Sequence, residues 1–417
     1  MRSGLRRPSA PNSSLFRAPL GAAVALACLL TTACGNEQES TATTTQVDLA
    51  ALEVGNYPTE AVALGKATTD EQAALVEAQR LAEVVPLPRE IDPALNYARQ
   101  FNQSRTFTDV SIPPISRELL LSRERFDAVA PGFISGHFSQ ARTHANANLS
   151  WEMANYILLY SDADAAKQAV PAIAAEHRQA LGDKYTETRI DKYPDARATW
   201  TSTYDALYVW HSIGRFLILT VINDHLSEEI GADDLPGLTA HASQVIGALP
   251  AGLEKFQPTP REQWSTLDRD IDGLLSMAVP AANDGGATGT TVPAVYQRRG
   301  ALHVAQVTDK DEALFDETGV DLVAFNGGAL YRAKDPASAQ LLADRRAQLG
   351  RLYVIAPGPT GLPSANCHES REEFRGSTPR FHCSIAVGRY AAEIGANQLA
   401  DAHQRISAQY ALLAEAE

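Results

Sequence analysis

The sequence predicts an α+β protein made of two related domains, each an antiparallel sheet packed with helices. Three observations indicate this fold class. The chain has 417 residues, more than the roughly 100–200 residues of an ordinary domain. Residues 280–293 are rich in Gly, Thr and Pro and have no apolar period, as is typical of flexible linkers. A pattern of strands and helices also recurs on the two sides of that linker.

The N-terminal residues 1–33 predict an export signal. Four arginines and no acidic residue precede an apolar run from about Ala18 to Leu30. This run is shorter than the ~20 residues that a membrane-spanning helix needs. The small residues that follow it, up to Ala33, are those that a secretory cleavage site requires.

The cysteine at position 34 predicts attachment of lipid. A small residue before Cys34 resembles the bacterial lipobox, in which the cysteine is acylated and becomes the new N-terminus. The usual leucine three positions before the cysteine is replaced by Thr31. Cys28 is a rival acceptor, and secretion without lipid is the other alternative. Cys34 is favoured because residues 34–50 then form a polar tether.

The charge of the chain limits its partners. The formal net charge is −14, and loss of residues 1–33 with their four arginines lowers it to about −18. No basic stripe is present, which argues against nucleic acid and against electrostatic adhesion to anionic lipid. The membrane is therefore expected to be a partner only through acyl chains on Cys34. We expect an exported protein at the outer face of the plasma membrane or in the cell envelope.

An internal repeat predicts the architecture of residues 51–279 and 294–417. A strand at 156–160, followed by a helix with an aspartate cap at Asp162, matches a strand at 321–325, a turn and a helix capped by Asp335. Aspartate at this position accepts hydrogen bonds from free helix amides. The repeat indicates a duplicated strand-helix-strand-strand-helix unit, which in the first half follows a helical lead. The alternative is two unrelated halves that use common α+β elements.

A second match extends the repeat. The motif Ile-Gly-Arg-Phe at 213–216 matches Val-Gly-Arg-Tyr at 387–390, so the two matches have offsets of 173 and 174 residues. Both motifs lie within apolar strand patterns, at 208–221 and 382–394. Glycine inside a strand marks a bulge or a close approach of backbones. We therefore expect Gly214 and Gly388 to make the same packing contact in each half.

Several segments carry a resemblance to a known family. The sequence resembles an uncharacterised family of exported lipoproteins from mycobacteria, nocardiae and rhodococci over nearly the whole mature chain. It is also loosely similar to small α+β sensor modules found outside the cell in that lineage. The resemblance implies export and a two-part build, and it carries over no activity, no cofactor and no catalytic residue. The segments are 52–59, 77–82, 90–95, 382–390 and 402–411.

One acidic motif is a weak candidate for calcium. Asp268, Asp270 and Asp272 alternate and are followed by Gly273, like the first half of a calcium loop. Val279 stands where the closing bidentate glutamate belongs. The preferred interpretation is an acidic turn before the linker, without metal.

The remaining cysteines, Cys367 and Cys383, predict a disulfide. Each lies next to a histidine, so zinc could be proposed from the two Cys-His pairs. Neighbouring residues on a strand point to opposite faces, which makes a tetrahedral site from both pairs difficult. An exported protein favours a disulfide, and these two cysteines remain once Cys28 leaves with the signal and Cys34 takes lipid.

Four residues of the first half form the candidate ligand site. Tyr204, Tyr208 and Trp210 alternate along one predicted strand and could line an apolar pocket, although such stripes are usually core. Arg215 lies just beyond this strand and could take an acidic group, although pairing with a carboxylate is the simpler expectation for it and for Arg389. We expect the pocket in the first domain or at its border with the second, because ligand sites favour crevices between domains.

Catalysis has little support in the sequence. Ser135 lies directly beside Gly136, so the G-x-S-x-G elbow of hydrolases is absent. His137 and His144 are expected near a turn, facing solvent or capping. We expect a non-catalytic module that binds or senses a small molecule, a lipid or an envelope component. A scaffold that contacts other envelope proteins is the alternative, and a hydrolytic enzyme comes third.

Overall fold

A computed structural model describes residues 47–99, 105–112, 115–281, 292–371 and 379–416. Residues 47–417 form one compact unit. Cys34 and the predicted export signal lie outside the described residues. Within the described part of the chain, no helix is both long enough and apolar enough to span a membrane.

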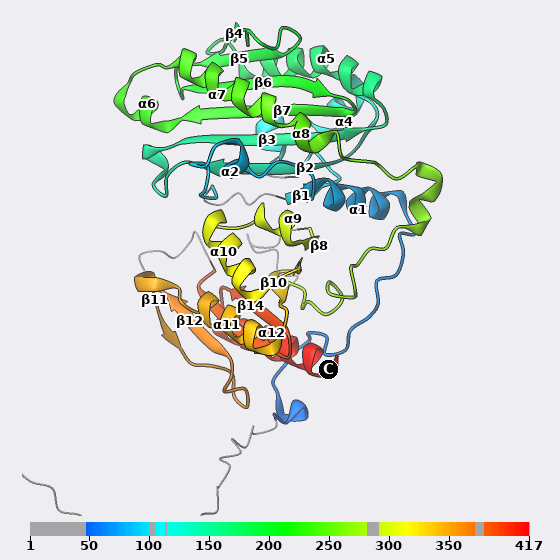
Figure 1. Cartoon of the computed structure of the whole chain (residues 1–417), viewed down its shortest axis with the longest axis vertical. Helices are drawn as coiled ribbons and strands as arrows, with labels where there is room; N and C mark the ends of the chain where they lie inside the picture. Colours follow the sequence, from blue (N-terminus) through cyan, green and yellow to red (C-terminus); the bar gives the residue numbers. More distant parts are fainter. Residues whose placement is uncertain (1–46, 100–104, 113–114, 282–291, 372–378, 417) are drawn as a thin grey trace, which may run out of the picture. The chain divides into compact units, whose positions relative to one another are not determined.

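The first half contains a seven-stranded antiparallel sheet (Figure 1). Its order is β1-β2-β3-β7-β6-β5-β4. The central strands β3 and β7 are buried along nearly their whole length. The strands are β1 (Arg105–Phe107), β2 (Phe133–Arg142), β3 (Trp151–Tyr160), β4 (Thr186–Thr188), β5 (Arg197–Thr201), β6 (Ala206–Ile213) and β7 (Phe216–Asp224).

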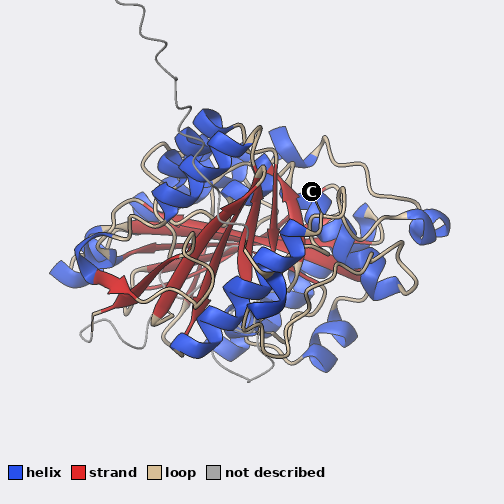
Figure 2. Cartoon of the chain, turned by 90° about the horizontal axis from the view of Figure 1, so that it is seen from below, coloured by secondary structure: helices blue, strands red, loops and turns tan. Residues whose placement is uncertain are grey.

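Helices cover both faces of this sheet. The long helix α5 packs with β3, β6 and β7 in one core cluster, and α7 packs on the opposite face. Figure 2 shows the strands inside and the helices outside them. The helices of this half are α1 (Asp70–Ala82), α2 (Pro88–Ile91), α3 (Ile115–Leu119), α4 (Arg123–Val129), α5 (Ala163–Leu181), α6 (His225–Ile230), α7 (Leu235–Ala248) and α8 (Pro250–Leu253).

The second half contains another seven-stranded antiparallel sheet, with the order β8-β9-β10-β14-β13-β12-β11. α11 covers one face and α12 the other. The elements are β8 (Ala294–Gln297), α9 (Arg298–Leu302), α10 (Thr308–Thr318), β9 (Leu322–Phe325), β10 (Gly328–Arg332), α11 (Pro336–Arg346), β11 (Tyr353–Ala356), β12 (Asn366–Ser370), β13 (Phe381–Val387), β14 (Tyr390–Ala396) and α12 (Leu399–Ala414).

The two halves have the same topology. Numbered from the first strand of each half, both sheets read 1-2-3-7-6-5-4. Two short helices join the first two strands, one helix follows the third, and a helix follows the seventh in both halves. The predicted aspartate caps are present: Asp162 accepts a hydrogen bond from the Ala165 amide at 2.8 Å, and Asp335 accepts one from the Ser338 amide at 2.7 Å. The α+β fold with a duplicated unit is therefore confirmed.

The structure corrects the alignment of one strand. The strand equivalent to β3 is β10, and the predicted strand at 321–325 is β9, the equivalent of β2. Asn326 and Gly327 join β9 to β10 in a tight hairpin, with Gly327 at φ 81°. Asn-Gly between two short apolar runs is a strong hairpin signal, and it explains why two strands fit where the sequence pattern predicted one.

The repeated glycines also have a different role from the one expected. Each lies in the turn of a hairpin, Gly214 between β6 and β7 and Gly388 between β13 and β14. Their φ angles are 52° and 49°, a region that favours glycine. An added Cβ on Gly214 would meet no atom within 4 Å. The expected close packing contact is therefore wrong at this glycine, and the requirement is conformational.

Polar contacts join the two halves at their border. The Glu83 carboxylate, at the end of α1, accepts hydrogen bonds from the amides of Gln297 and Gly300 at 2.8 and 2.9 Å. Burial raises the pKa of Glu83 to about 7, although these amides and Arg299 oppose the rise.

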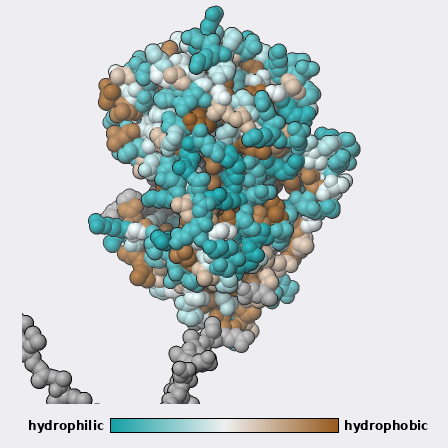
Figure 3. All heavy atoms as spheres, in the orientation of Figure 1, coloured by the Kyte–Doolittle hydropathy of each residue, from teal (hydrophilic) through white to brown (hydrophobic). Residues whose placement is uncertain are grey.

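On the face drawn in Figure 3, hydrophilic residues dominate and hydrophobic residues form small separate groups. The linker predicted at 280–293 stays a prediction, because residues 282–291 lie outside the described part.

Candidate ligand-binding groove

A groove of about 430 Å³ lies mainly between three segments of the chain, and Arg269, Pro293 and Asn326 complete its lining. Its walls are the extended arm at 58–64 and the segment 275–280, and its floor is one face of α1. This volume falls within the roughly 300–1,000 Å³ of small-molecule sites. The lining residues are Pro58, Glu60, Val62, Leu64, Gln72, Leu75, Val76, Gln79, Arg269, Leu275, Ser276, Ala278, Pro280, Pro293 and Asn326.

Helix α1 supplies the floor because it is apolar on two faces. One face, with the fully buried Ala78 and Leu81, packs toward the first sheet. Another face carries Leu75, Val76 and Gln79, which lie within a helical turn of one another and line the groove. The Thr69 side chain caps the helix at the amide of Gln72. One short helix thus packs into the core and forms part of the groove.

The arm that forms the opposite wall is fixed to the segment after residue 266. The amide of Ala67 donates to the Leu267 carbonyl at 2.8 Å, and the Arg269 amide donates to the Gly65 carbonyl at 3.0 Å. The Arg269 guanidinium also donates to the Leu64 carbonyl at 3.2 Å. These bonds hold an arm without regular structure across the groove.

Most polar groups of the lining already have partners. Ser276 donates to the Gly273 carbonyl at 2.7 Å, and the Asn326 amide donates to the Ala278 carbonyl at 2.8 Å. Gln79 differs, because its side chain makes no hydrogen bond with the described residues although only 7% of the residue is exposed. Gln79 is therefore the polar group that a ligand in this apolar groove could satisfy.

The residues proposed from the sequence as a ligand site do not line one pocket. Trp210 is 2% exposed and packs under α5, with its ring 5.7 Å from that of His177. Tyr208 packs against His177 and Tyr185. Tyr204 lies in the turn before β6 and is 50% exposed, and Arg215 lies in the turn after β6. Because Tyr204 and Arg215 flank opposite ends of the strand, the four residues are not brought together.

The acidic motif makes three separate structural contacts. Asp268 pairs with Lys66, and Asp272 pairs with Arg332 at 2.8 Å. Both oxygens of Asp270 accept backbone amides, from Leu275 and Ser276. No group of three or more metal-ligating side chains occurs among the described residues. The three carboxylates of this acidic turn therefore have separate protein partners.

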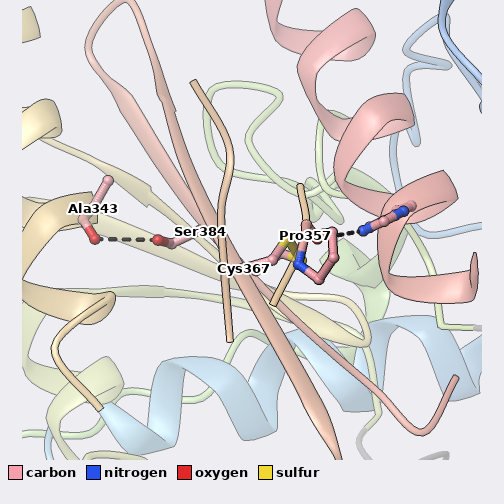
Figure 4. Close-up of a disulfide and its surroundings, with 6 residues drawn as sticks. Ala343, Pro357, Cys367 and Ser384 are labelled. Carbon is pink, nitrogen blue, oxygen red and sulfur yellow. Dashed lines mark hydrogen bonds between the residues drawn. A yellow bond between two sulfur atoms is a disulfide. The ribbon is translucent and has the colours of Figure 1, made fainter. Parts of the chain in front are cut away.

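The predicted disulfide is present (Figure 4). Cys367 and Cys383 are direct partners on β12 and β13, with Cα atoms 4.1 Å apart, and their sulfurs are bonded. Their neighbours His368 and His382 are also cross-strand partners. Because side chains alternate along a strand, both histidines lie on the face opposite the disulfide. This alternation separates the four residues that a zinc site would need.

The histidine predicted near a turn is instead in the border between the halves. His137 lies on β2 and is fully buried, whereas His144 is exposed and caps a local turn. The ring centroid of His137 is 4.8 Å from that of His303, which accepts or donates a 2.9 Å hydrogen bond with Ser139. Burial lowers the pKa of His137, and it lowers the pKa of His303 to about 4. No sequence pattern pointed to His303, because its partners come from distant segments.

The two arginines of the repeated motif are held in equivalent hairpin turns. The Arg389 side chain donates to the Ala333 carbonyl at 2.9 Å instead of pairing directly with a carboxylate. The Arg215 carbonyl accepts a hydrogen bond from the Tyr160 amide. The corresponding carbonyl of Arg389 accepts one from the Ala333 amide. This repeated backbone bond ties each hairpin turn to the end of the neighbouring strand.

The fold and the groove define a class of protein: a two-domain α+β protein, built by duplication, with an apolar groove beside its first helix. The chain belongs to the DUF7373 family. Residues 64–269 match the model of the N-terminal domain of unknown function of that family, and residues 274–416 match the model of its C-terminal domain. No curated protein and no solved structure matches the chain.

Proposed function

We propose that this protein is a lipid-anchored binding module of the cell envelope that holds an apolar small molecule or lipid in the α1 groove. The observation that carries the proposal is a groove with a mostly apolar lining, in which the side-chain amide of Gln79 makes no hydrogen bond with the described residues. An apolar ligand with one neutral polar group would satisfy this amide and bury the side chains around it. A site with much apolar surface and few polar groups is the usual form of a small-molecule pocket.

Binding is favoured over catalysis by the state of the polar groups in the lining. Ser276, a lining residue with a hydroxyl, donates to the Gly273 carbonyl at 2.7 Å. A nucleophile needs a base within hydrogen-bond reach, and Ser276 has a carbonyl there instead. A hydrolytic role therefore remains the weaker candidate.

Attachment to the envelope is proposed from the sequence around Cys34. An apolar run, small residues and then a polar tether are the order that an acylated N-terminal cysteine requires. Expression of the chain in an actinobacterial host should give a membrane-bound protein whose mature N-terminus is acylated Cys34. The variant Cys34→Ser should leave the membrane fraction. A mature N-terminus elsewhere, or equal partitioning of the two proteins, would contradict the proposal.

The groove is tested with the uncharged apolar probe N-phenyl-1-naphthylamine, whose fluorescence rises in apolar sites. The full-length protein should raise the probe fluorescence above that of the same detergent micelles without protein, and Leu75→Glu should weaken this protein-dependent binding at least tenfold, because it places a charge in the apolar lining. The matched control is Glu71→Gln on the exposed side of α1. Equal binding by Leu75→Glu and the control would place the probe elsewhere and contradict the proposed site.

A further inference from the structure

The arm at 58–64 turns alternate side chains toward the α1 groove. Pro58, Glu60, Val62 and Leu64 line the groove, and the residues between them do not. An extended chain produces this alternation, because its successive side chains point to opposite sides. Val62 is nevertheless 75% exposed, so most of its apolar surface remains in contact with water. The arm therefore borders the groove without covering it.

The arm is fixed at its ends and free between them. Residues 58–63 make no hydrogen bond with the described part of the chain, through backbone or side chain. At one end, the Tyr57 hydroxyl donates to the Asp401 carboxylate. At the other end, the Gly65 carbonyl accepts a hydrogen bond from the Arg269 amide at 3.0 Å. Segments with few contacts and an exposed backbone open at a low cost in free energy. The middle of the arm can therefore move while its two ends stay in place.

Two further features let the arm move toward the groove. Gly65, directly after the arm, has φ 63°, a region that favours glycine. An added Cβ there would meet no atom within 4 Å, so the glycine serves the backbone conformation and not packing. A small residue that can absorb a change in φ and ψ is suited to a hinge. The Glu60 carboxylate, on the face that lines the groove, has an opposite charge in the same lining, the Arg269 guanidinium. Closure therefore need not bury that carboxylate without a cation in the site.

We propose, on the basis of the binding function proposed above, that residues 58–63 form a lid, hinged at Gly65, that closes over a ligand in the α1 groove. Closure buries Val62 against the ligand and against the groove face of α1, which carries Leu75 and Val76. A bound apolar ligand supplies surface that the arm can cover, so it favours the closed state over the open one. Release then requires reopening, which slows the dissociation of the ligand.

The movement is tested by pulsed electron double resonance between spin labels on Ala63→Cys and Glu71→Cys in the full-length protein. Both residues are exposed, and Ala63 lies on the face of the arm that points away from the groove, so its label leaves closure free. The matched control pair is Glu71→Cys with Glu254→Cys, another exposed residue of the first half. The native disulfide takes up no label, and protein without the introduced cysteines corrects for any label on Cys34.

Saturation with N-phenyl-1-naphthylamine should shift the mean distance between the labels at 63 and 71 by more than about 2 Å, the scale of loop rearrangements on binding. The control distance should stay unchanged. Protein-dependent fluorescence of the probe without this shift would overturn the lid and leave the groove as a binding site. Absence of that fluorescence would contradict the binding function, and the lid with it.

The rate of probe release tests the role of Val62 in closure. Val62→Asp should raise the dissociation rate about tenfold, because the closed lid would bury a charge against an apolar lining. Ala63→Asp places the same charge on the opposite face of the arm and should leave the rate unchanged. Both residues are exposed, so neither variant should change the midpoint of thermal unfolding. Stopped-flow fluorescence after mixing with excess empty micelles measures the rates, and equal rates for the two variants would overturn the lid.

Discussion

The two domains share a topology and differ in the layer of side chains beneath their long helix. In the first domain a cross-strand row of large residues fills the space under α5, and in the second domain the equivalent row is smaller and partly polar. The comparison shows that the two domains keep the same strand order but differ in the side chains of this interior layer. The equivalent pairs are Phe138 and Phe325, Tyr156 and Ala329, Leu219 and Glu393, and Trp210 and Ser384.

The helix above this layer changed with it. Arg346 of α11 holds the position that Ile173 has in α5, eleven residues after the aspartate cap. Arg346 lies 3.7 Å from Glu393 and pairs with Asp311 at 2.9 Å. An apolar contact region in one domain is thus an ion-pair network in the other. Such networks add charge-specific geometry but little net stability, because desolvation offsets the attraction.

The domains also differ in what stabilises them. The second sheet has a disulfide between β12 and β13, whereas the first has several buried histidines, including His177 and His211. The four tryptophans of the chain lie between residues 151 and 264. Tryptophan fluorescence therefore reports on the first half alone, and far-UV circular dichroism reports on both.

Removal of the disulfide should have the largest effect. Replacing both Cys367 and Cys383 by serine frees a loop whose ends are 16 residues apart, which should lower the free energy of unfolding by about 3 kcal/mol. Guanidinium unfolding should show a larger shift by circular dichroism than by tryptophan fluorescence. Equal shifts of both signals would mean that the two halves unfold as one.

Acidification should destabilise the first half more than the second. Burial lowers the pKa of His177 to about 4 and that of His211 to about 3. The unfolded chain therefore binds protons between pH 6.5 and about 4 that the folded chain does not. Their stabilising contribution is complete above pH 6.5 and is lost as the pH falls, by roughly 2 kcal/mol for each such histidine between pH 7 and pH 5.

Groups whose pKa is raised in the folded protein, such as His225 and Glu83, act in the opposite direction. His225 has a raised pKa because its ring hydrogen-bonds to Glu152, and Glu83 has a raised pKa because of burial. The measurement is guanidinium unfolding by tryptophan fluorescence at pH 7 and pH 5. His211→Gln keeps a polar group beside Thr220 without a titration in this range, so it should flatten the pH dependence. An unchanged slope in this variant would refute the assignment.

Exchange of the interior ion pair should have a smaller effect. Glu393→Leu gives position 393 the leucine of its first-domain equivalent, Leu219, and removes one partner of Arg346. We expect the free energy of unfolding to fall by only about 1–2 kcal/mol, because the Glu393 side chain is 33% exposed. Adding Arg346→Ile should recover part of the loss. Thermal unfolding by circular dichroism measures both. A double variant less stable than the single one would show that the ion pair with Asp311 dominates.

The smallest effects are expected at the two equivalent turns. Gly214→Ala and Gly388→Ala should each cost about 1 kcal/mol, since both glycines have positive φ. Asparagine tolerates this region better than alanine, so the two Gly→Asn variants should cost less. Chemical unfolding compares the four proteins, and unequal losses in the two halves would show that the turns are not equivalent.

The sequence predicted the features that depend on local chemistry. The aspartate caps follow from residues close together in the chain, the repeat from short motifs that match each other, and the disulfide from the count of cysteines left after export. The strand pattern failed at Tyr204, because Asp205 has φ 39° and breaks the alternation that placed Tyr204 with Tyr208 and Trp210. Asn326 and Gly327 could have predicted a turn followed by the separate strand β10. The apolar residues on both sides of this turn were instead interpreted as one strand.

Local sequence patterns could not predict the candidate groove. Its lining comes from the arm at 58–64, from α1 and from the segment 275–280, which are far apart in sequence. Gln79 looks like any polar residue of an amphipathic helix until burial and its lack of a partner are known. The aromatic residues predicted as a ligand site do not line this groove, and that site stays a prediction.

Native mass spectrometry of the protein purified from a host envelope tests the proposed function most directly. The wild-type protein should carry a bound apolar molecule of defined mass, and Leu75→Glu should lose it while Glu71→Gln keeps it. Retention in the first and third proteins and loss in the second would support binding in the α1 groove. A wild-type protein without any bound molecule, or the same molecule retained by Leu75→Glu, would contradict it.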